Sequence, residues 1–298
     1  MPEYEPAILT GAPCGILFES PHLGREVPPE LRHHLRLMEA AAQRLDGGID
    51  FAGRYLLGAV GGQWTYSTVS RLVVDLNRGS AHVDSRICPQ WPGACVYEDG
   101  GVIVPYAEIG GVKVRLYDDP LPEEEVNYRL EKYWRPYHER LRGIVDSSVQ
   151  TYGQALLISL HSAYPWREHQ REDRPAIYLG TRNGKTCGAA ILSALRNGLE
   201  EKGFLAVAEN YYQGAYTTQT YSEIDGLDAI QIELDRRYLL EESMPDAVFP
   251  HRETMLQALA AVLQTISLSS QRLSSGPARR LLSPRAYVDP ATGDVFPF

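Results

Sequence analysis

The chain has 298 residues, of which 44% are hydrophobic and 22% charged, which is the composition of a globular protein with a sizeable core. Its formal net charge is −9 and its Lys and Arg residues do not cluster, which excludes nucleic acid as a partner because such binding neutralises phosphates. No run approaches the roughly eighteen apolar residues that span a bilayer, and the first residues lack the order of a signal peptide. We therefore expect a cytoplasmic protein without a membrane partner.

The domain organisation is predicted to be simple. No linker rich in Gly, Ser or Pro divides residues 1–268, so we expect one catalytic α/β domain there. Residues 269–298 are rich in Ser, Arg, Pro and Gly, which predicts a C-terminal arm or flexible tail. The four cysteines form no C-x-x-C pair, so the sequence indicates buried free thiols rather than a zinc knuckle or a redox dithiol.

Four apolar runs are predicted to be strands. Residues 15–19 end just before Pro21, which cannot continue a central ladder, and residues 71–76 are rich in β-branched side chains. Residues 155–160 are apolar apart from Ser159, as expected of a strand covered on both faces, and residues 229–234 contain a single acid.

Helical patterns lie between these runs. Residues 123–150 keep a helical spacing of apolar side chains, and Pro136 should kink that helix or separate two helices. Further helices are expected over residues 188–202 and from about residue 253 to residue 267. Strands that alternate with helices predict an α/β sandwich.

Two histidines follow predicted strands, where open α/β sheets bind ligands. His22 and His161 could supply the nitrogen ligands of a hydrolytic zinc site, which commonly adds one carboxylate and keeps an open position for water. Asp46 and Asp50 are the candidate carboxylates, and Asp46 is preferred because the glycines after it allow close backbone approach. The same ligands would suit cobalt, nickel or manganese. Taken singly, each of these residues could equally be an ordinary loop or helix-cap residue.

Three further residues have side chains suited to hydrolysis. Glu233 lies within an apolar run, where a carboxylate is costly unless it faces a charge or a polar pocket, so it is the candidate base. Arg78 could grip a substrate carboxylate with two parallel hydrogen bonds, and Asn77 could donate beside it. The alternative for Glu233 is an exposed position on an edge strand. The alternative for Arg78 is a surface ion pair, and the alternative for Asn77 is a turn residue.

Two other motifs are set aside. Residues 180–186 resemble a phosphate-binding loop but have three residues between the glycines where that loop has four, so we expect a turn that enters a helix. No G-x-S-x-G motif surrounds Ser20 or Ser162, so the sequence gives no support for a serine triad.

The order of the motifs resembles the N-formylglutamate amidohydrolase family. Its pattern runs Pro-His-Ser-Gly, then Ser-Arg-x-Val-Val-Asp-Leu-Asn-Arg, then His-Ser, then Gln-x-Glu. In this chain the pattern is matched by residues 20–24, 70–78, 160–162 and 231–237. Weaker similarities lie at residues 133–138 and 214–217.

This resemblance implies a three-layer αβα sandwich with a central mixed sheet, of the zinc-exopeptidase type. It implies a zinc-dependent amidohydrolase that releases formate and L-glutamate from N-formyl-L-glutamate, as in histidine degradation. The residues it assigns are the metal ligands His22, Asp46 and His161, the base Glu233, Arg71 for carbonyl polarisation, and Asn77, Arg78 and Tyr216 for substrate binding.

The chain departs from the family pattern at positions that are expected to face or support the substrate. Leu23 replaces a serine, Ala215 replaces a glycine, and residues 239–242 replace a Tyr-Met-Asp-Glu segment. Two alternatives therefore stay open: a carboxypeptidase-like peptidase, and a non-catalytic protein that binds acyl amino acids on the same fold.

Overall fold

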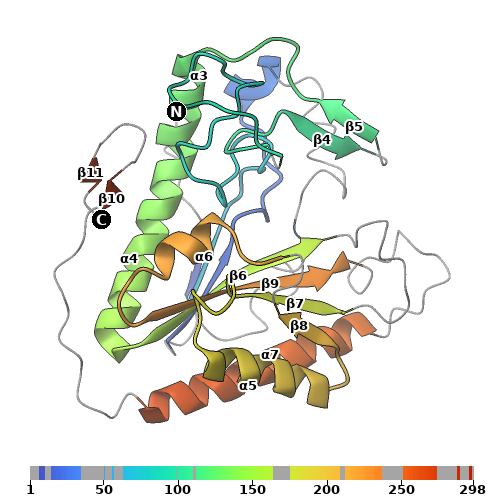
Figure 1. The fold of residues 1–298 in the computed structure, drawn as a ribbon, viewed down its shortest axis with the longest axis vertical. Coiled ribbons are helices and arrows are strands. Elements are labelled where there is room, and N and C mark those ends of the chain that lie inside the picture. The colour runs from blue at the N-terminus through green and yellow to red at the C-terminus, as the bar shows by residue number, and fades with distance from the viewer. Residues whose placement is uncertain are drawn as a thin grey trace.

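A seven-stranded mixed sheet forms the centre of the protein, which we describe from a computed structural model (Figure 1). The structure describes residues 7–10, 15–34, 50, 56, 63–98, 100–109, 112–163, 175–208, 212–236, 251–273, 287–288 and 295–296. The strand order is β1-β3-β2-β6-β9-β7-β8. The strands of this sheet are β1 (Ala7–Thr10), β2 (Ile16–Ser20), β3 (Gln63–Tyr66), β6 (Ala155–Ala163), β7 (Ile177–Gly180), β8 (Ala206–Ala208) and β9 (Leu227–Asp235).

The middle of the sheet is parallel. Strand β6 pairs in parallel with β2 on one side and with β9 on the other, whereas β1 and β7 run antiparallel to their neighbours β3 and β9. The carboxyl ends of β2, β6 and β9 therefore meet at one edge of the sheet. Of the predicted strands, 15–19, 155–160 and 229–234 are confirmed.

Helices cover both faces of the sheet and make three layers. On one face lie α4 (Arg135–Tyr152) and α6 (Tyr216–Tyr221), and on the other lie α5 (Ala189–Glu201) and α7 (His251–Leu273) (Figure 1). Alternate residues of a strand reach opposite layers, as Leu157 packs in the cluster with α4 while Leu156 and Ile158 pack in the cluster with α5 and α7. The predicted αβα sandwich with a mixed sheet is confirmed.

The long helical segment before β6 is interrupted next to Pro136, as its sequence predicts. α3 (Glu123–Arg129) passes into a π-helical turn (Leu130–Trp134), and α4 starts one residue before the proline. Pro136 has no N–H to donate, so it suits the first turn of a helix. The π-helical turn before Pro136 is wider than an α-helical turn, and α4 begins directly after it. Tyr137 and His138, in the first turn of α4, are buried in the core beside the sheet.

One predicted strand is wrong. Residues 71–76 form turns instead, with backbone hydrogen bonds from Val73 to Ser70 and from Arg78 to Asp75. Val73 and Val74 are fully buried, but they pack in the cluster of α3 and α4 rather than in a ladder. A turn that is buried on all sides needs apolar residues, as a buried strand does. The composition of this segment therefore led to the wrong prediction. The turns lie near the hairpin of β4 (Tyr106–Ile109) and β5 (Val112–Arg115), above the sheet in Figure 1.

The remaining predictions concern peripheral parts of the chain. Residues 181–187 form the expected turn, which leads into α5. α7 runs to Leu273, so the predicted boundary at residue 268 falls inside a helix, and β10 (Tyr287–Val288) pairs with β11 (Val295–Phe296) beyond it. Cys88, Cys95 and Cys187 are free thiols, and Cys95 is exposed rather than buried. In the described part of the chain, no helix is both long and apolar enough to cross a membrane.

Candidate metal centre and active site

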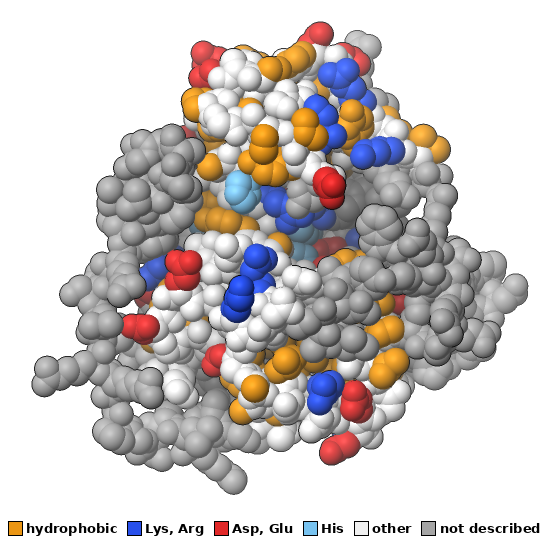
Figure 2. Space-filling model, in the orientation of Figure 1, with side chains coloured by type: hydrophobic (Ala, Val, Ile, Leu, Met, Phe, Trp, Pro, Cys, Tyr) orange, Lys and Arg blue, Asp and Glu red, His pale blue; other side chains and the backbone are white. Residues whose placement is uncertain are grey.

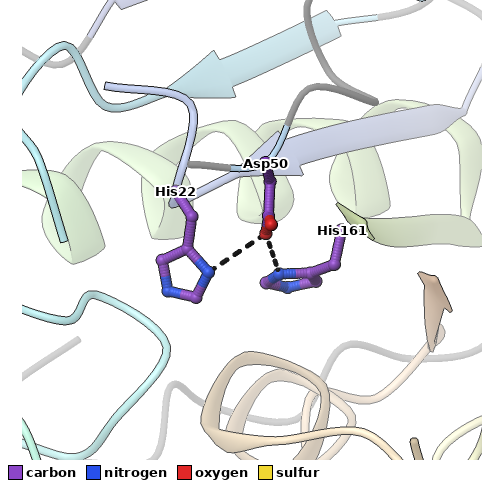
Figure 3. A group of neighbouring side chains, drawn as sticks. All are labelled: His22, Asp50 and His161. Carbon is purple, nitrogen blue, oxygen red and sulfur yellow. Dashed lines mark hydrogen bonds and ion pairs between the residues drawn. The ribbon is translucent and has the colours of Figure 1, made fainter. Parts of the chain in front are cut away.

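Three buried side chains converge at the carboxyl edge of the sheet. His22 lies in the turn after β2, His161 lies near the end of β6, and Asp50 reaches between their rings (Figure 3). The Oδ2 atom of Asp50 is 3.2 Å from Nδ1 of His22 and 2.8 Å from Nδ1 of His161. One donor atom from each residue lies within 4.8 Å of the other two.

The far nitrogen of each ring has its own partner. Nε2 of His22 lies 2.7 Å from the buried carboxylate of Asp75, while Nε2 of His161 lies 2.9 Å from Ser159 Oγ and 3.1 Å from Asn77 Nδ2. Partners on the far nitrogen fix the tautomer and the orientation of a ligating histidine. Both rings are therefore held with Nδ1 toward the centre of the cluster.

Asp50 is the carboxylate that the structure places at the cluster. Its backbone N–H donates to the carbonyl of His22, and its Oδ1 accepts from Arg236 at 3.1 Å and from Ser162 Oγ at 3.4 Å. Oδ2 is thus left to face the two rings. The carboxylate preferred from the sequence, Asp46, lies outside the described residues, so its role as a ligand stays a prediction.

The three donors fit a divalent metal ion in number, chemistry and spacing. Two imidazole nitrogens and one carboxylate oxygen are a common ligand set of catalytic zinc, and separations near 3 Å suit ligands about 2 Å from one ion. Burial opposes protonation of His161, but the hydrogen bond to Asp50 and the surrounding carboxylates raise its pKa to about 9. The site therefore favours a cation between these three groups.

Glu233 lies beside this cluster on β9, directly across the ladder from His161. Its side chain is buried, Oε1 accepts from Gln231 Nε2 at 3.0 Å, and Oε2 has no hydrogen-bond partner among the described residues. Burial raises its pKa to about 7, with Asp50 acting in the same direction and with His161, Arg236 and Arg71 opposing it. A carboxyl group poised near neutral pH with one unused oxygen has the properties of a general acid–base.

Asn77 and Arg78 follow the turn that carries Asp75. Asn77 Oδ1 accepts from the backbone N–H of Thr217 at 3.0 Å, which directs its Nδ2 toward His161. The Arg78 guanidinium donates to the carbonyl of Asn77, and the Arg78 carbonyl accepts from the Trp134 indole at 2.8 Å. The structure therefore places Asn77 at the cluster and anchors Arg78 beside it.

Tyr216 packs against the chain that follows Asn77 and Arg78. Its ring lies 5.7 Å from the Trp134 ring and 5.2 Å from the His138 ring, measured between centroids. A side-chain carbon at Gly79 would come within 3.3 Å of the Tyr216 ring, so the chain after Arg78 passes directly against this tyrosine. Tyr216 thus borders the same space as the Asn77–Arg78 segment.

Arg71 pairs with Asp75, and the sequence reasoning assigned no role to this aspartate. Burial opposes ionisation of Asp75, but Arg71, His22 and Arg78 outweigh it and hold the pKa of this carboxyl well below its usual range. Asp75 also accepts the backbone N–H of Asn77 at 3.0 Å. In the sequence, Asp75 is a single acidic residue within an apolar run. The same feature identified Glu233 as a candidate site residue.

Figure 2 shows a hollow in the face of the molecule between the part that contains β4 and β5 and the part built on the sheet. Basic, acidic and histidine side chains line the bottom of this hollow, while hydrophobic side chains lie on the part above it. The described side chains in this face therefore leave an opening toward charged groups, as a small polar ligand would require.

The fold and these residues define an α/β protein with a buried His-Asp-His cluster and an adjacent buried glutamate at the carboxyl edge of its sheet. The family model of N-formylglutamate amidohydrolase matches residues 14–240, and the chain belongs to this family. The family expected from the sequence motifs is thus confirmed.

Similar proteins agree with this assignment. An N-formylglutamate deformylase of Pseudomonas putida is 32% identical over 150 residues, which are 49% of this chain and 55% of that relative. The crystal structure of an N-formylglutamate amidohydrolase from Ralstonia eutropha JMP134 has a TM-score of 0.76 at 24% identity, over 90% of this chain and 99% of that one. A gene product of Agrobacterium tumefaciens has a TM-score of 0.62 at 20% identity, over 91% and 96% of the two chains. The two structures share the fold.

Proposed function

We propose that this protein is a metal-dependent amidohydrolase that cleaves N-formyl-L-glutamate into formate and L-glutamate. The observation that carries the proposal is the convergence of His22, Asp50 and His161 beside Glu233, with Asn77 and Arg78 at the same edge of the sheet. The name of the Pseudomonas putida relative supports the choice of substrate.

Three side chains would hold the metal ion: His22, Asp50 and His161. A divalent ion there, zinc in the first place, would supply a Lewis acid for the amide carbonyl and lower the pKa of a water molecule. Asp75 and Ser159 would keep the two rings oriented through their far nitrogens.

Glu233 would move the proton. Its free Oε2 would accept a proton from water as the oxygen attacks the formyl carbon, and the same carboxyl group would then protonate the leaving nitrogen. One water and one amide bond are consumed, and formate and the free amine of L-glutamate are produced. Because its pKa is raised to about 7, the carboxyl group can both accept and return a proton near neutral pH.

The substrate would be oriented by its carboxylate. The Arg78 guanidinium can form two parallel hydrogen bonds with a carboxylate, and the Asn77 amide can add a third. Arg71 pairs with Asp75, which contacts His22, and its positive charge would help to stabilise the negative charge that develops on the carbonyl oxygen.

A substrate panel tests the proposal. The zinc-loaded protein would be offered N-formyl-L-glutamate, N-acetyl-L-glutamate, N-formyl-L-leucine and short peptides, with formate or free amine as the readout. We expect N-formyl-L-glutamate to give the highest kcat/KM. Preferential cleavage of peptides would replace the proposal by a peptidase, and tight binding without cleavage of any compound would replace it by a binding protein.

A further inference from the structure

A carboxylate outside the metal cluster lies buried in the centre of the sheet. Glu19 of β2 is fully buried, and its two oxygens accept hydrogen bonds from Ser159 Oγ and from Tyr137 OH, the latter at 2.6 Å. Both donors are neutral hydroxyl groups. A buried carboxylate is costly unless hydrogen bonds and a nearby positive charge compensate it, so its presence calls for a cation close by.

The strand register connects Glu19 to the metal cluster. Glu19 and Ser159 are partners across the β2–β6 ladder, and His161 lies two residues beyond Ser159, on the same face of β6. Ser159 Oγ is 2.9 Å from Nε2 of His161. A continuous path of hydrogen bonds thus runs from Tyr137 through Glu19 and Ser159 to a ring that faces Asp50 with its other nitrogen.

The direction of these hydrogen bonds follows from the chemistry of each group. Ser159 has one hydroxyl hydrogen, which goes to Glu19, so its oxygen can accept a hydrogen from His161 Nε2. Asn77 Nδ2 lies near the same nitrogen but can only donate. A neutral imidazole that offers the Nδ1 lone pair to a metal must carry its hydrogen on Nε2. In that tautomer Ser159 is the partner of the ring, and the Asn77 donor becomes available to a substrate.

We infer that Glu19 and Ser159 are positioning residues of the metal centre. Through Ser159, the Glu19 carboxylate holds His161 in the tautomer that presents Nδ1 to the ion and increases the basicity of the ring. Tyr137 fixes the outer oxygen of Glu19. This inference rests on the metal site of the proposed function. In that site the Asp75 carboxylate contacts His22 directly. The Glu19 carboxylate would act on His161 in the same way, but through the Ser159 hydroxyl.

Zinc affinity of the full chain tests this relay, measured by competition with a chromophoric chelator. Substitution of a residue that holds a metal ligand in place typically weakens metal binding about 10- to 100-fold, and we expect a loss in that range for Ser159→Ala and for Glu19→Gln. The double variant should lose little more than the weaker-binding single variant, because both changes break one path. Ser159→Thr keeps the hydroxyl and should recover most of the affinity.

Ser20→Ala is the matched control. Ser20 is equally buried on β2 and its hydroxyl lies 3.5 Å from the Leu160 carbonyl, so the variant removes a buried hydroxyl but no group of the relay. The control should bind zinc like the wild type. If Ser159→Ala binds zinc as tightly as the control, the relay is overturned. If Ser159→Ala does not fold, Glu19→Gln with wild-type affinity overturns it.

The outcomes separate this inference from the proposed function. A wild-type protein that binds zinc but hydrolyses no N-formyl-L-glutamate refutes the proposed reaction, while the affinities of the variants still decide on the relay. A wild-type protein that takes up no zinc overturns both.

Discussion

Replacing Glu233 with glutamine should greatly slow turnover and, in the metal-free protein, make the fold more stable at alkaline pH. Burial raises the pKa of this carboxyl group from 4.5 to about 7. A shift of this size means that folding disfavours the ionised form by roughly 3 kcal/mol. Because the folded pKa is the higher one, this cost is absent below pH 4.5, grows as the pH rises toward 7 and is complete above it.

Glutamine keeps the shape of the side chain and carries no charge. Its Oε1 can still accept from Gln231 Nε2, so the variant retains the one hydrogen bond that Glu233 makes in the described structure. At pH 8 we expect the free energy of unfolding of the variant to exceed that of the wild type by up to about 3 kcal/mol, and at pH 4.5 we expect little difference. Activity on N-formyl-L-glutamate should fall by about 10²- to 10⁴-fold, the usual contribution of a general acid–base.

Urea unfolding of both metal-free proteins at pH 4.5 and pH 8, together with formate release by the zinc-loaded forms, measures these effects. A glutamine variant that is less stable than the wild type at pH 8 would refute the argument from burial. Full activity of this variant would refute the role of Glu233 in proton transfer.

Three further outcomes follow from the site. Asp50→Ala should abolish stoichiometric zinc binding whereas Asp46→Ala should retain it, and elemental analysis that finds the reverse would move the carboxylate ligand to Asp46. Arg78→Lys keeps the charge but loses the planar fork, so its KM for N-formyl-L-glutamate should rise by about 10- to 100-fold, with the Asn77→Ala variant as a second probe of the clamp. Burial lowers the pKa of His138 to about 3 despite its bond to the Leu76 carbonyl, so acid destabilises the fold below pH 6.5. Between pH 7 and pH 5 the wild type should lose about 2 kcal/mol of unfolding free energy more than His138→Gln, and equal losses in urea titrations would contradict this.

The parallel strands could be predicted from the sequence because their environment is uniform. Strands β2, β6 and β9 are covered by helices on both faces, so they appear as short apolar runs with polar residues at the carboxyl end. The same reasoning failed for residues 71–76, since a turn whose valines are buried on all sides has the same composition as a buried strand. Composition reports burial, and it does not report which hydrogen bonds the backbone makes.

The site could be predicted where its residues lie at the ends of strands. His22, His161 and Glu233 fall there, and the structure brings them together with Asn77. The residues that hold the rings were missed. Ser159 lies only two residues before His161, but its bond to Glu19 spans 140 residues, and Asp75 contacts His22 across 53 residues through the turns of the fold. No local spacing records such contacts. Likewise, the sequence could not decide between Asp46 and Asp50 as the carboxylate ligand, because it does not show which side chain reaches the two histidine rings.

The most direct test of the central claim is to measure metal content and formate release on the same purified protein. The protein would be analysed as isolated, after chelation and after zinc is restored, with N-formyl-L-glutamate as substrate. We expect near-stoichiometric metal, loss of formate release on chelation and its recovery with zinc. A protein that releases formate at an undiminished rate without metal, or that binds no zinc and stays inactive when zinc is added, would contradict the account.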